Sequence, residues 1–503
     1  MTGLFLEAVV FLAGAVFMAV EVVGSRVLAP DFGSSVFTWG SLIGVFLAAL
    51  SVGYYLGGEA ADRLPGEPLL YAALGGAGGL TMLVPAVAPA LTKAVLAADL
   101  GPRIGPLAAA AVLFAIPAVL LGMVSPLAIK LRAASLSGLG RTAGRLYALS
   151  TAGSIAGTFA ASFWLIPAFG TRPILTGLGL VLTGLSAAGF GLQRQWRLAA
   201  TPLGVAVVVI ALLPGQPLPA TSMVLVHEEE SHYHRILVVE DGHSRWLKFD
   251  NSWQSGMSLT DPFDTPTVYT GYFRLPMLVT PHARRVLFVG LGGGSAPKDF
   301  WRRYPRVAVD AVELDPAVVR VAREYFALPE DSRLRVVVED GRAFLTKPGD
   351  EYDLIVLDAY YADAIPFHLT TVEFWRIAAG RLAPGGIVAV NIIGCLAGEP
   401  GGLFAAMYKT MGEVFADRAA YGVGLGPASP ATVRRNIIVF ARGTGAQRLA
   451  PAIAVAALRA SPEYGELVAT HYAAPEVGAA AAVLTDDHAP VDALLHLYKP
   501  RRP

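Results

Sequence analysis

A short apolar segment that runs directly into a cluster of glycines is the feature that most limits how this chain can fold. Residues 286–289 predict a buried strand, and residues 295–304 predict a helix with Ser295 as its N-cap. A strand, a glycine turn and a helix N-terminus form a corner that suits a nucleotide, because no Cβ blocks the ligand and free N–H groups point at it. The glycines of this turn are Gly290, Gly292, Gly293 and Gly294.

Each of the next three predicted strands ends in a carboxylate. The strands are expected at residues 307–314, 334–338 and 352–357, and their acids are Glu313, Asp340 and Asp358. The carboxyl ends of parallel strands meet at the edge where open α/β sheets bind ligands. Glu313 stands roughly 20 residues after the glycine turn, where an acid can accept hydrogen bonds from both ribose hydroxyls. The order of these elements predicts a Rossmann-like, nucleoside-binding fold.

The first half of the chain is very apolar. The chain has 503 residues, 54% of them hydrophobic, with a mean hydropathy of +0.53, and nearly all of the excess lies before residue 215. Since about 20 apolar residues cross a bilayer, we predict an N-terminal transmembrane helical bundle of about seven spans in a multi-pass protein of the cell membrane. The spans are expected near residues 4–28, 36–57, 69–92, 105–129, 146–168, 172–192 and 198–214.

The second half of the chain has the pattern of a soluble protein. Prolines and glycine at residues 214–219 predict a linker, residues 236–249 predict β-hairpins, and strand–helix alternation then continues to about residue 394. We therefore expect a transmembrane domain at 1–214, a linker with a small β-region at 215–283, and a Rossmann-like domain with a C-terminal tail at 284–503.

Charge and cysteine content exclude several classes of protein. The 39 basic and 39 acidic residues give no net formal charge, so the sequence offers no case for nucleic acid as a partner. The single cysteine, Cys395, excludes an intrachain disulfide framework and a cysteine-rich metal site. We expect no metal and no bound prosthetic group.

With these motifs in place, residues 224–445 resemble the spermidine synthases, which are aminopropyltransferases built on the nucleoside-methyltransferase fold. The whole chain resembles the membrane-fused bacterial relatives of that family, which carry stretches similar to residues 21–30 and 53–58. The resemblance implies decarboxylated S-adenosylmethionine, or S-adenosylmethionine itself, as co-substrate and an amine such as putrescine as acceptor. Family members are often homodimers.

The resemblance also implies roles for individual residues. Asp358 would be the catalytic acid/base, and Tyr269 the active-site tyrosine. Glu313 would bind the ribose hydroxyls, while Asp340, followed by Gly341, would bind the adenine amino group. Gln254 matches a glutamine that lies near the nucleoside. The remaining candidates, for the amine pocket, are Tyr360, Asp363 and Asp264.

The sequence departs from the family pattern at three places, one of them directly after the tyrosine, where the family usually has Gln or His followed by Glu and this chain has Thr270 and Gly271. The family has an aspartate in its glycine corner that holds the amine of the decarboxylated nucleoside, and the position matched to it here is Gly294. The second acid after the fourth strand is displaced by two residues, to Asp363. A corner without the aspartate is expected to admit the carboxylate of ordinary S-adenosylmethionine as well.

Three functions are compatible with these features. The leading interpretation is a membrane-bound aminopropyltransferase of the spermidine synthase type. The alternatives are an S-adenosylmethionine-dependent methyltransferase on the same fold, and a polyamine transporter or sensor whose soluble half binds a nucleoside without catalysis.

The side of the membrane on which the soluble half lies is left open. The loop at 130–145 carries Lys130, Arg132, Arg141 and Arg145 and no acid, which favours a cytoplasmic loop and a cytoplasmic N-terminus. Seven spans would then place residues 215–503 outside, whereas the supply of an adenosyl nucleoside made in the cytosol favours the inside.

Overall fold

The structure, a computed structural model, divides into two compact units that are described separately. The first comprises Met1–Ala220 with Glu229–His234, and the second comprises Thr221–Glu228 with Arg235–Pro503. The residues described are 3–33, 35–64, 66–133, 138–212, 223–361, 364–398, 401–426, 428–443, 448–473 and 481–496. The predicted linker at 214–219 lies outside them.

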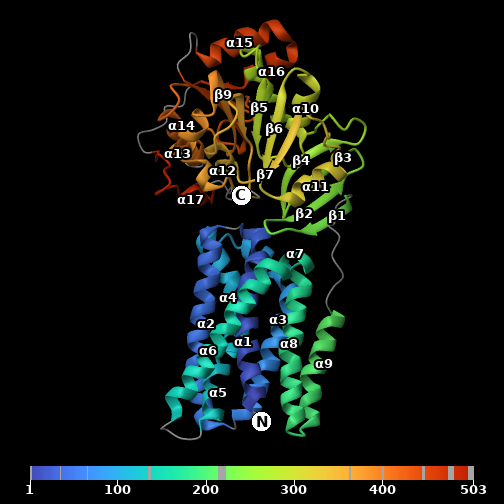
Figure 1. The fold of residues 1–503 in the computed structure, drawn as a ribbon, viewed down its shortest axis with the longest axis vertical. Helices are drawn as coiled ribbons and strands as arrows, with labels where there is room; N and C mark the ends of the chain where they lie inside the picture. The colour runs from blue at the N-terminus through green and yellow to red at the C-terminus, as the bar shows by residue number, and fades with distance from the viewer. Residues whose placement is uncertain are drawn as a thin grey trace. The chain divides into compact units, whose positions relative to one another are not determined.

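The first unit is a bundle of long helices (Figure 1). It consists of α1 (Gly3–Phe32), α2 (Val36–Arg63), α3 (Gly66–Ala97), α4 (Gly101–Gly122), α5 (Val124–Arg132), α6 (Leu139–Ala160), the π-helix η2 (Ala161–Leu165), α7 (Ile166–Phe169), α8 (Thr171–Leu192) and α9 (Trp196–Leu212).

Within the described residues, six helical stretches are long and apolar enough to cross a membrane. Two of them join neighbouring elements, namely Arg103–Arg132 (α4 and α5) and Leu139–Phe169 (α6 to α7). The predicted number of about seven spans is therefore not confirmed. The difference lies in α9, which has 17 residues, fewer than the roughly 20 that usually cross a bilayer.

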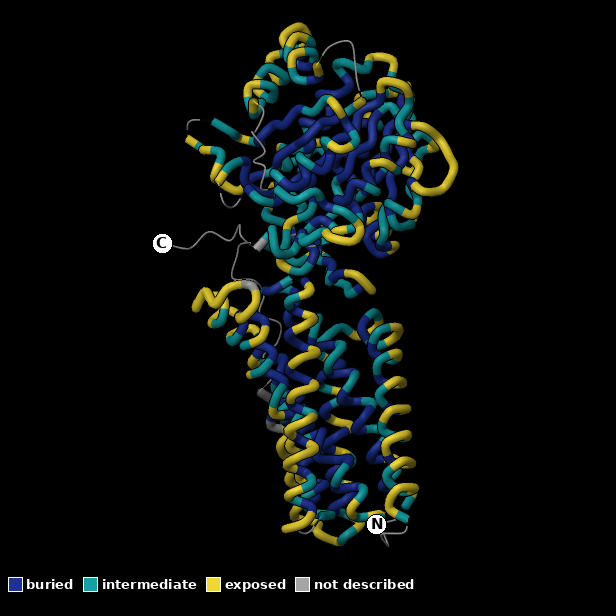
Figure 2. Tube along the Cα trace, turned by 90° about the vertical axis from the view of Figure 1, so that its left-hand side faces the viewer, coloured by how far each residue is buried: buried dark blue, intermediate teal, exposed yellow. Residues whose placement is uncertain are grey.

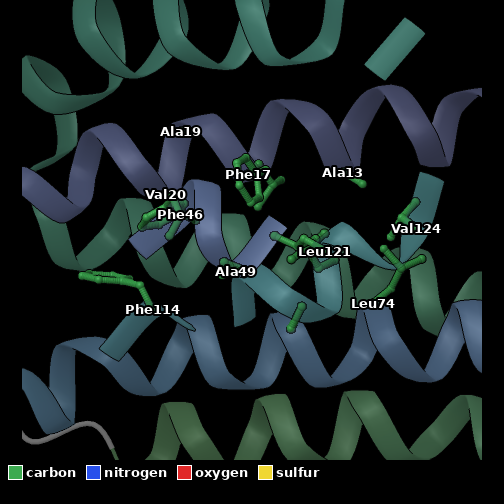
Figure 3. Packing of buried hydrophobic residues seen from close by; sticks show 14 of the residues in the cluster. Ala13, Phe17, Ala19, Val20, Phe46, Ala49, Leu74, Phe114, Leu121 and Val124 are labelled. Atoms are coloured by element: carbon green, nitrogen blue, oxygen red, sulfur yellow. The ribbon is translucent and has the colours of Figure 1, made fainter. Parts of the chain in front are cut away.

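The interior of the bundle is filled by side chains from several helices. Phe17, Phe46 and Phe114 meet in this cluster, with ring centroids 5.4 Å apart for the first pair and 5.7 Å for the second (Figure 3). Exposed positions follow the outer faces of the same helices (Figure 2). That distribution suits a bundle whose outer face contacts lipid.

Glycines let the helix backbones approach one another closely. A Cβ at Gly153 would lie 2.0 Å from the carbonyl oxygen of Phe11, and a Cβ at Gly157 would lie 2.0 Å from that of Ala15, so α6 lies directly against α1. Gly53 of α2 approaches the carbonyl oxygen of Val119 on α4 in the same way, at 2.4 Å. Small residues at helix contacts permit this kind of packing in membranes.

A four-stranded sheet in the order β1-β2-β3-β4 precedes the large sheet; its β2–β3 and β3–β4 pairs are antiparallel, and all of it except the last two residues of β1 belongs to the second unit. The strands are β1 (Val224–Glu230), β2 (Arg235–Glu240), β3 (Ser244–Phe249) and β4 (Ser252–Ser258), which confirms the predicted hairpins. Ile236, Val238 and Leu247 of this sheet pack against Val318 and Val321 of α11 (Pro316–Tyr325).

An eight-stranded sheet forms the centre of the second unit, in the order β12-β10-β11-β9-β8-β5-β6-β7. Its parallel strands are β5 (Arg285–Val289), β6 (Ala308–Glu313), β7 (Leu334–Val338), β8 (Tyr352–Leu357) and β9 (Leu382–Gly394). The antiparallel strands are β10 (Asp417–Gly422), β11 (Arg435–Arg442) and β12 (His471–Tyr472). The predicted α/β fold and its first four strands are confirmed.

Helices cover both faces of this sheet. One apolar cluster joins the sheet to α12, α13 and α14, and another joins it to η3, α10 and α15. The bounds of these helices are η3 (Val268–Leu278), α10 (Ser295–Arg303), α12 (Gly341–Thr346), η4 (Phe367–Leu369), α13 (Val372–Ala379), α14 (Gly402–Gly412), α15 (Leu449–Ala460), α16 (Pro462–Ala469) and α17 (Val491–His496).

The contact between α1 and α6 predicts the effect of one added methyl group. Gly157→Ala should lower the free energy of unfolding by roughly 1–3 kcal/mol, because the new Cβ would force the two backbones apart. Gly177→Ala is the matched control, since nothing lies within 4 Å of a Cβ there and alanine favours the helix. Thermal unfolding in one detergent compares the two variants, and equal melting temperatures would contradict this view of the contact.

Candidate functional site

The strand order of the large sheet creates one edge where a ligand can bind. β5 and β8 are neighbours in the sheet, and the chain continues from β5 to β6 on one side and from β8 to β9 on the other, so these two connections run in opposite directions. At such a switch point a crevice opens beyond the carboxyl ends of the strands. The glycine turn, Glu313 and Asp358 follow β5, β6 and β8 and therefore meet at this crevice.

Gly290 brings the carboxyl ends of β5 and β8 into close backbone contact. Its φ is +102°, and a Cβ there would lie 2.2 Å from the carbonyl oxygen of Asp358. The N–H of Asp358 in turn donates to the carbonyl oxygen of Val289, at 2.9 Å. Only glycine fits this position, and the turn and Asp358 are consequently held together.

The rest of the glycine turn is packed against neighbouring side chains. A Cβ at Gly292 would lie 2.6 Å from Ser255 Oγ, and one at Gly294 would lie 2.6 Å from Leu328 Cδ1. At Gly293 the side chains of Ser255 and Phe326 would both be 3.0 Å away. At Gly294 the φ of +76° and the nearby Leu328 side chain favour glycine over the aspartate that the resemblance would place there.

Two expectations about this turn were wrong. Its N–H groups are not free, because those of Gly290, Leu291, Gly293 and Gly294 donate to Val312, Glu313, Ser255 and Leu291 respectively. Ser295 is not the N-cap, which is Gly294; the Ser295 hydroxyl donates to the carbonyl oxygen of Gly256 at 2.9 Å. The N–H groups of the turn are thus paired with neighbouring strands and, in the case of Gly294, with the turn itself.

Glu313 connects the end of β6 to the glycine turn. One carboxylate oxygen accepts from the N–H of Leu291 at 3.0 Å, and the other accepts from the N–H of Asp315 at 3.1 Å. Burial raises the pKa of Glu313, while these backbone hydrogen bonds oppose the rise. Gly292 is a third backbone donor to Glu313, and the carboxylate, which offers about four acceptor sites, keeps capacity for a ligand hydroxyl.

Asp340 lies at the end of β7 and caps α12. It accepts from the N–H of Ala343 at 2.9 Å, and its other oxygen lies 2.9 Å from His368 Nε2. Burial acts to raise the pKa of Asp340, but the hydrogen bonds from Ala343 and His368 outweigh it and lower the pKa. The next residue is Gly341, and a larger residue would not fit there, because a Cβ would lie 2.3 Å from Val289 Cγ1.

Asp358, at the end of β8, is hydrogen-bonded on both carboxylate oxygens. Asn391 Nδ2 donates to Oδ1 at 2.9 Å, and the Tyr269 hydroxyl donates to Oδ2 at 3.0 Å. Burial raises the pKa of Asp358, whereas these two hydrogen bonds lower it. The pKa of Tyr269 is raised well above its ordinary value by burial and by the Asp358 carboxylate, so this phenol stays protonated and acts as a donor.

The other predicted site residues differ in what surrounds them. Gln254 lies in β4 beside Ser255, where the register of the β3–β4 pairing shifts. The Tyr360 hydroxyl donates to the carbonyl oxygen of Asn391 at 2.8 Å. Asp264 is exposed, and its carboxylate accepts from the N–H of Thr265. Asp363 lies outside the described residues.

Four residues of this region were not predicted from the sequence. Ser255 contacts the glycine turn and His368 contacts Asp340. Asn391 contacts Asp358, and Asn436 contacts Asn391. Asn391 could have been noticed in the sequence, because it is a polar residue inside the apolar run 387–393. The local sequence gave no comparable signal for Ser255, His368 or Asn436.

Metal-ligating residues do not gather at this edge. In the described part of the chain, no group of three or more His, Cys, Asp or Glu side chains could hold a metal ion. The arrangement as it stands offers carboxylates, a phenol and amides, which can bind a nucleoside and accept a proton.

Part of the chain is similar to known proteins. Residues 272–430 match the family model described as the spermine/spermidine synthase domain. The chain is 30% identical over 285 residues to a probable polyamine aminopropyl transferase of Bifidobacterium longum, covering 54% of this chain and 62% of that protein. It is 34% identical over 176 residues to a polyamine aminopropyltransferase of Vibrio vulnificus, covering 33% of this chain and 58% of that protein.

A solved structure of a probable spermidine synthase from Corynebacterium glutamicum covers 48% of this chain and 88% of its own length, with 22% identity and a TM-score of 0.40. The match to the two curated relatives extends over about three fifths of their length.

The position of Glu313 predicts how strongly its charge contributes to nucleoside binding. Glu313→Gln should weaken binding of an adenosyl nucleoside about 10- to 100-fold, because neutral hydrogen bonds replace those to a charged acceptor. Glu339→Gln, at the end of the adjacent strand, should change the dissociation constant little, since Glu339 pairs with Lys347. Isothermal titration of the full-length protein compares them, and equal losses would contradict a direct role for Glu313.

Proposed function

We propose that this chain, which carries the match to the spermine/spermidine synthase domain, is a membrane-anchored aminopropyltransferase. It would transfer an aminopropyl group from decarboxylated S-adenosylmethionine to an amine such as putrescine. The observation that supports this best is the hydrogen-bonded pair of Tyr269 and Asp358 beside the glycine turn. The curated relatives named above carry out, by their names, the same class of reaction.

In this proposal the nucleoside is held along the edge formed by β5, β6 and β7. Glu313 accepts hydrogen bonds from the ribose hydroxyls, and Asp340 accepts one from the adenine amino group. The sulfonium end then lies toward Asp358, because Gly290 and Asp358 are in backbone contact. Gln254, Tyr360, Asp363 and Asp264 are the remaining candidates for contacts with the two substrates.

The reaction is an in-line displacement at a carbon next to a positively charged sulfur. The amine nitrogen forms a bond to that carbon, the carbon–sulfur bond breaks, and its electron pair stays on sulfur as a neutral thioether. An alkyl amine has a pKa of about 10 and is mostly protonated at neutral pH, so it must lose a proton to attack. Asp358 attracts the ammonium group and accepts this proton, and the Tyr269 hydroxyl orients the carboxylate.

Two effects supply the acceleration in this scheme. Holding the two reactants in line can remove roughly 7–11 kcal/mol from the barrier. A general base typically adds about 10²- to 10⁴-fold. Burial raises the pKa of Asp358 and so makes its carboxylate a better proton acceptor, provided that it stays ionised at the working pH.

Product mass tests the proposed reaction and separates it from methyl transfer. The full-length protein in nanodiscs is incubated with putrescine and either decarboxylated or ordinary S-adenosylmethionine. The proposal predicts an acceptor heavier by one aminopropyl group, formed with the decarboxylated nucleoside. A product heavier by one methyl group, formed with the ordinary nucleoside, would instead support a methyltransferase, which the absence of an acid at Gly294 allows. Radiolabelled putrescine entering proteoliposomes without any new product would support the transporter.

The same assay tests the role of Asp358. Asp358→Asn should abolish transfer while nucleoside affinity changes by less than about threefold, because the amide cannot accept the amine proton. Asp353→Asn, at the other end of β8, is the control: its carboxylate accepts from the N–H groups of Arg284 and Arg285. That variant should be less stable but transfer at the normal rate. Equal loss of binding and transfer in Asp358→Asn would show a structural role.

We also propose that α9 is a seventh crossing of the membrane. At 1.5 Å per residue its 17 residues span about 26 Å, which a tilted or locally thinned bilayer of about 30 Å can accommodate. It runs alongside α3: Pro202 lies 3.3 Å from a Cβ at Gly75, and Val205 lies 3.2 Å from one at Gly79. Further along, Val209 is buried with Met82.

Labelling of single cysteines tests this topology. Gln195→Cys, in the turn before α9, and Glu330→Cys, in the soluble unit, are each placed in a Cys395→Ala background. Seven crossings predict that a membrane-impermeant maleimide reaches the two positions from opposite sides of sealed vesicles. Labelling of both from the same side would mean that six helices cross.

A further inference from the structure

A row of hydrogen-bonded side chains runs from Asp358 across three neighbouring strands. Leu357 of β8 is paired with Val390 of β9, so Asp358 and Asn391 follow side by side. Asn391 is paired with Ile438 of β11, and Asn436 stands two residues from Ile438 on the same face of the sheet. Asn391 Nδ2 lies 2.9 Å from Asp358 Oδ1, and Asn436 Nδ2 lies 3.0 Å from Asn391 Oδ1.

The chemistry of the row allows one direction of donation. An ionised carboxylate only accepts hydrogen bonds, so Asn391 must present its NH₂ group to Asp358. The Asn391 carbonyl oxygen then faces Asn436, which must present an NH₂ group of its own. Asn391 is 2% exposed, so an unmatched polar atom there would be costly and the amide has one favourable orientation.

The backbone at Asn391 is held as firmly as its side chain. The Tyr360 hydroxyl donates to the carbonyl oxygen of Asn391 at 2.8 Å and accepts from the N–H of Ile393 at 3.0 Å. This bridge ties the segment after β8 to the end of β9. Asn391 therefore cannot move away from Asp358 without breaking hydrogen bonds on two sides.

We propose that Asn391, kept in one amide orientation by Asn436, is a positioning residue that fixes the Asp358 carboxylate for proton uptake. This inference rests on the proposed role of Asp358 as the base and extends it to Asn391, which donates to Asp358, and to Asn436, which donates to Asn391. Tyr269 holds Oδ2 and Asn391 holds Oδ1, so the lone pairs left over point in fixed directions. The amine proton is then received in one geometry.

The row also favours the ionised form of Asp358. Burial raises its pKa, and the hydrogen bonds from Asn391 and Tyr269 counteract that rise. Among the described residues, Tyr269 from η3 donates to Asp358, and Tyr360 from the segment after β8 lies close enough to Tyr269 to raise its pKa. Glu313, on β6, is held by the N–H groups of Leu291 and Asp315, and the Cys395 thiol, on the segment that follows β9, donates to Thr432. The hydrogen bond from Asn391 to Asp358 can therefore be changed by a substitution at Asn436, which does not contact Asp358 directly.

The substitution Asn436→Asp tests the proposal from the far end of the row. A carboxylate at this position can only accept, so it draws the NH₂ group of Asn391 toward itself and turns the Asn391 oxygen toward Asp358. Asp358 then loses a donor and faces an acceptor. Its pKa should rise by about 1–2 pH units, and the acid limb of the kcat/KM profile should move to higher pH by the same amount. Asn436→Leu, which removes the anchor without forcing the flip, should give a smaller shift.

A double-mutant cycle separates this effect from the added charge. Asn391→Leu removes the donor directly and should shift the profile in the same direction but less far than Asn436→Asp, because leucine puts no acceptor beside Asp358. If Asn436 acts through Asn391, the double variant should show little more than Asn391→Leu alone. Additive shifts would mean that the introduced carboxylate acts through space, and they would overturn the proposal, as would equal profiles for Asn436→Asp and Asn436→Leu.

Titration of the Asp358 carboxyl by isotope-edited infrared spectroscopy gives a readout that needs no turnover. The full-length, substrate-free protein is measured, with Asp358→Asn as the subtracted reference. A shifted titration in a protein that transfers no aminopropyl group would sustain the positioning role and reject the proposed function. An unchanged titration in an active transferase would reject the positioning role alone.

Discussion

The backbone contact between β5 and β8 is the constraint on which the candidate site depends. Gly290 and Asp358 approach so closely that a single methyl group would not fit between them, and the N–H of Asp358 donates to Val289. Because the contact joins backbone to backbone, the glycine turn and the proposed base cannot move independently. In the proposed reaction, a nucleoside at the turn would be presented to Asp358 at a fixed distance, as an in-line displacement requires.

The three acids at this edge stand in different surroundings, although each follows a parallel strand. Glu313 accepts from backbone N–H groups, and Asp340 accepts from a helix N-terminus and from His368. Asp358 alone among these three is held on both oxygens by side chains, from Tyr269 and Asn391. A side-chain donor can be substituted without altering the fold, so the pKa of Asp358 can be changed by substituting Tyr269 or Asn391. The donors to Glu313 are backbone N–H groups, which a substitution does not remove.

The helical unit is organised by a different physical principle. Lipid tails are as apolar as the side chains that face them, so burial of apolar surface does little to bring helices together in a membrane. Close backbone approach is what the structure shows in this unit: Gly153 and Gly157 admit α1 to α6, and Gly53 admits α2 to α4. The same residue type therefore serves both units, once to bring helices together and once to join strands β5 and β8.

Much of the fold followed from local patterns. Apolar runs predicted β5 to β8, and the acids at the strand ends were visible in order along the chain. These features are local because strand formation and apolar length depend on a few consecutive residues. The number of spans was less certain, since the 17 residues of α9 lie at the limit of what length alone can decide.

What the tertiary structure decided was which polar groups are paired. The sequence alone predicted free N–H groups in the glycine turn, and the fold satisfies them with Glu313 and Ser255. Tyr269 and Asp358 are 89 residues apart, and Asn391 and Asn436 are 45 apart, so no local pattern could join them. Strand order and register bring these side chains to one face of one edge. Composition and periodicity thus determined the elements, and only their packing determined the hydrogen bonds between them.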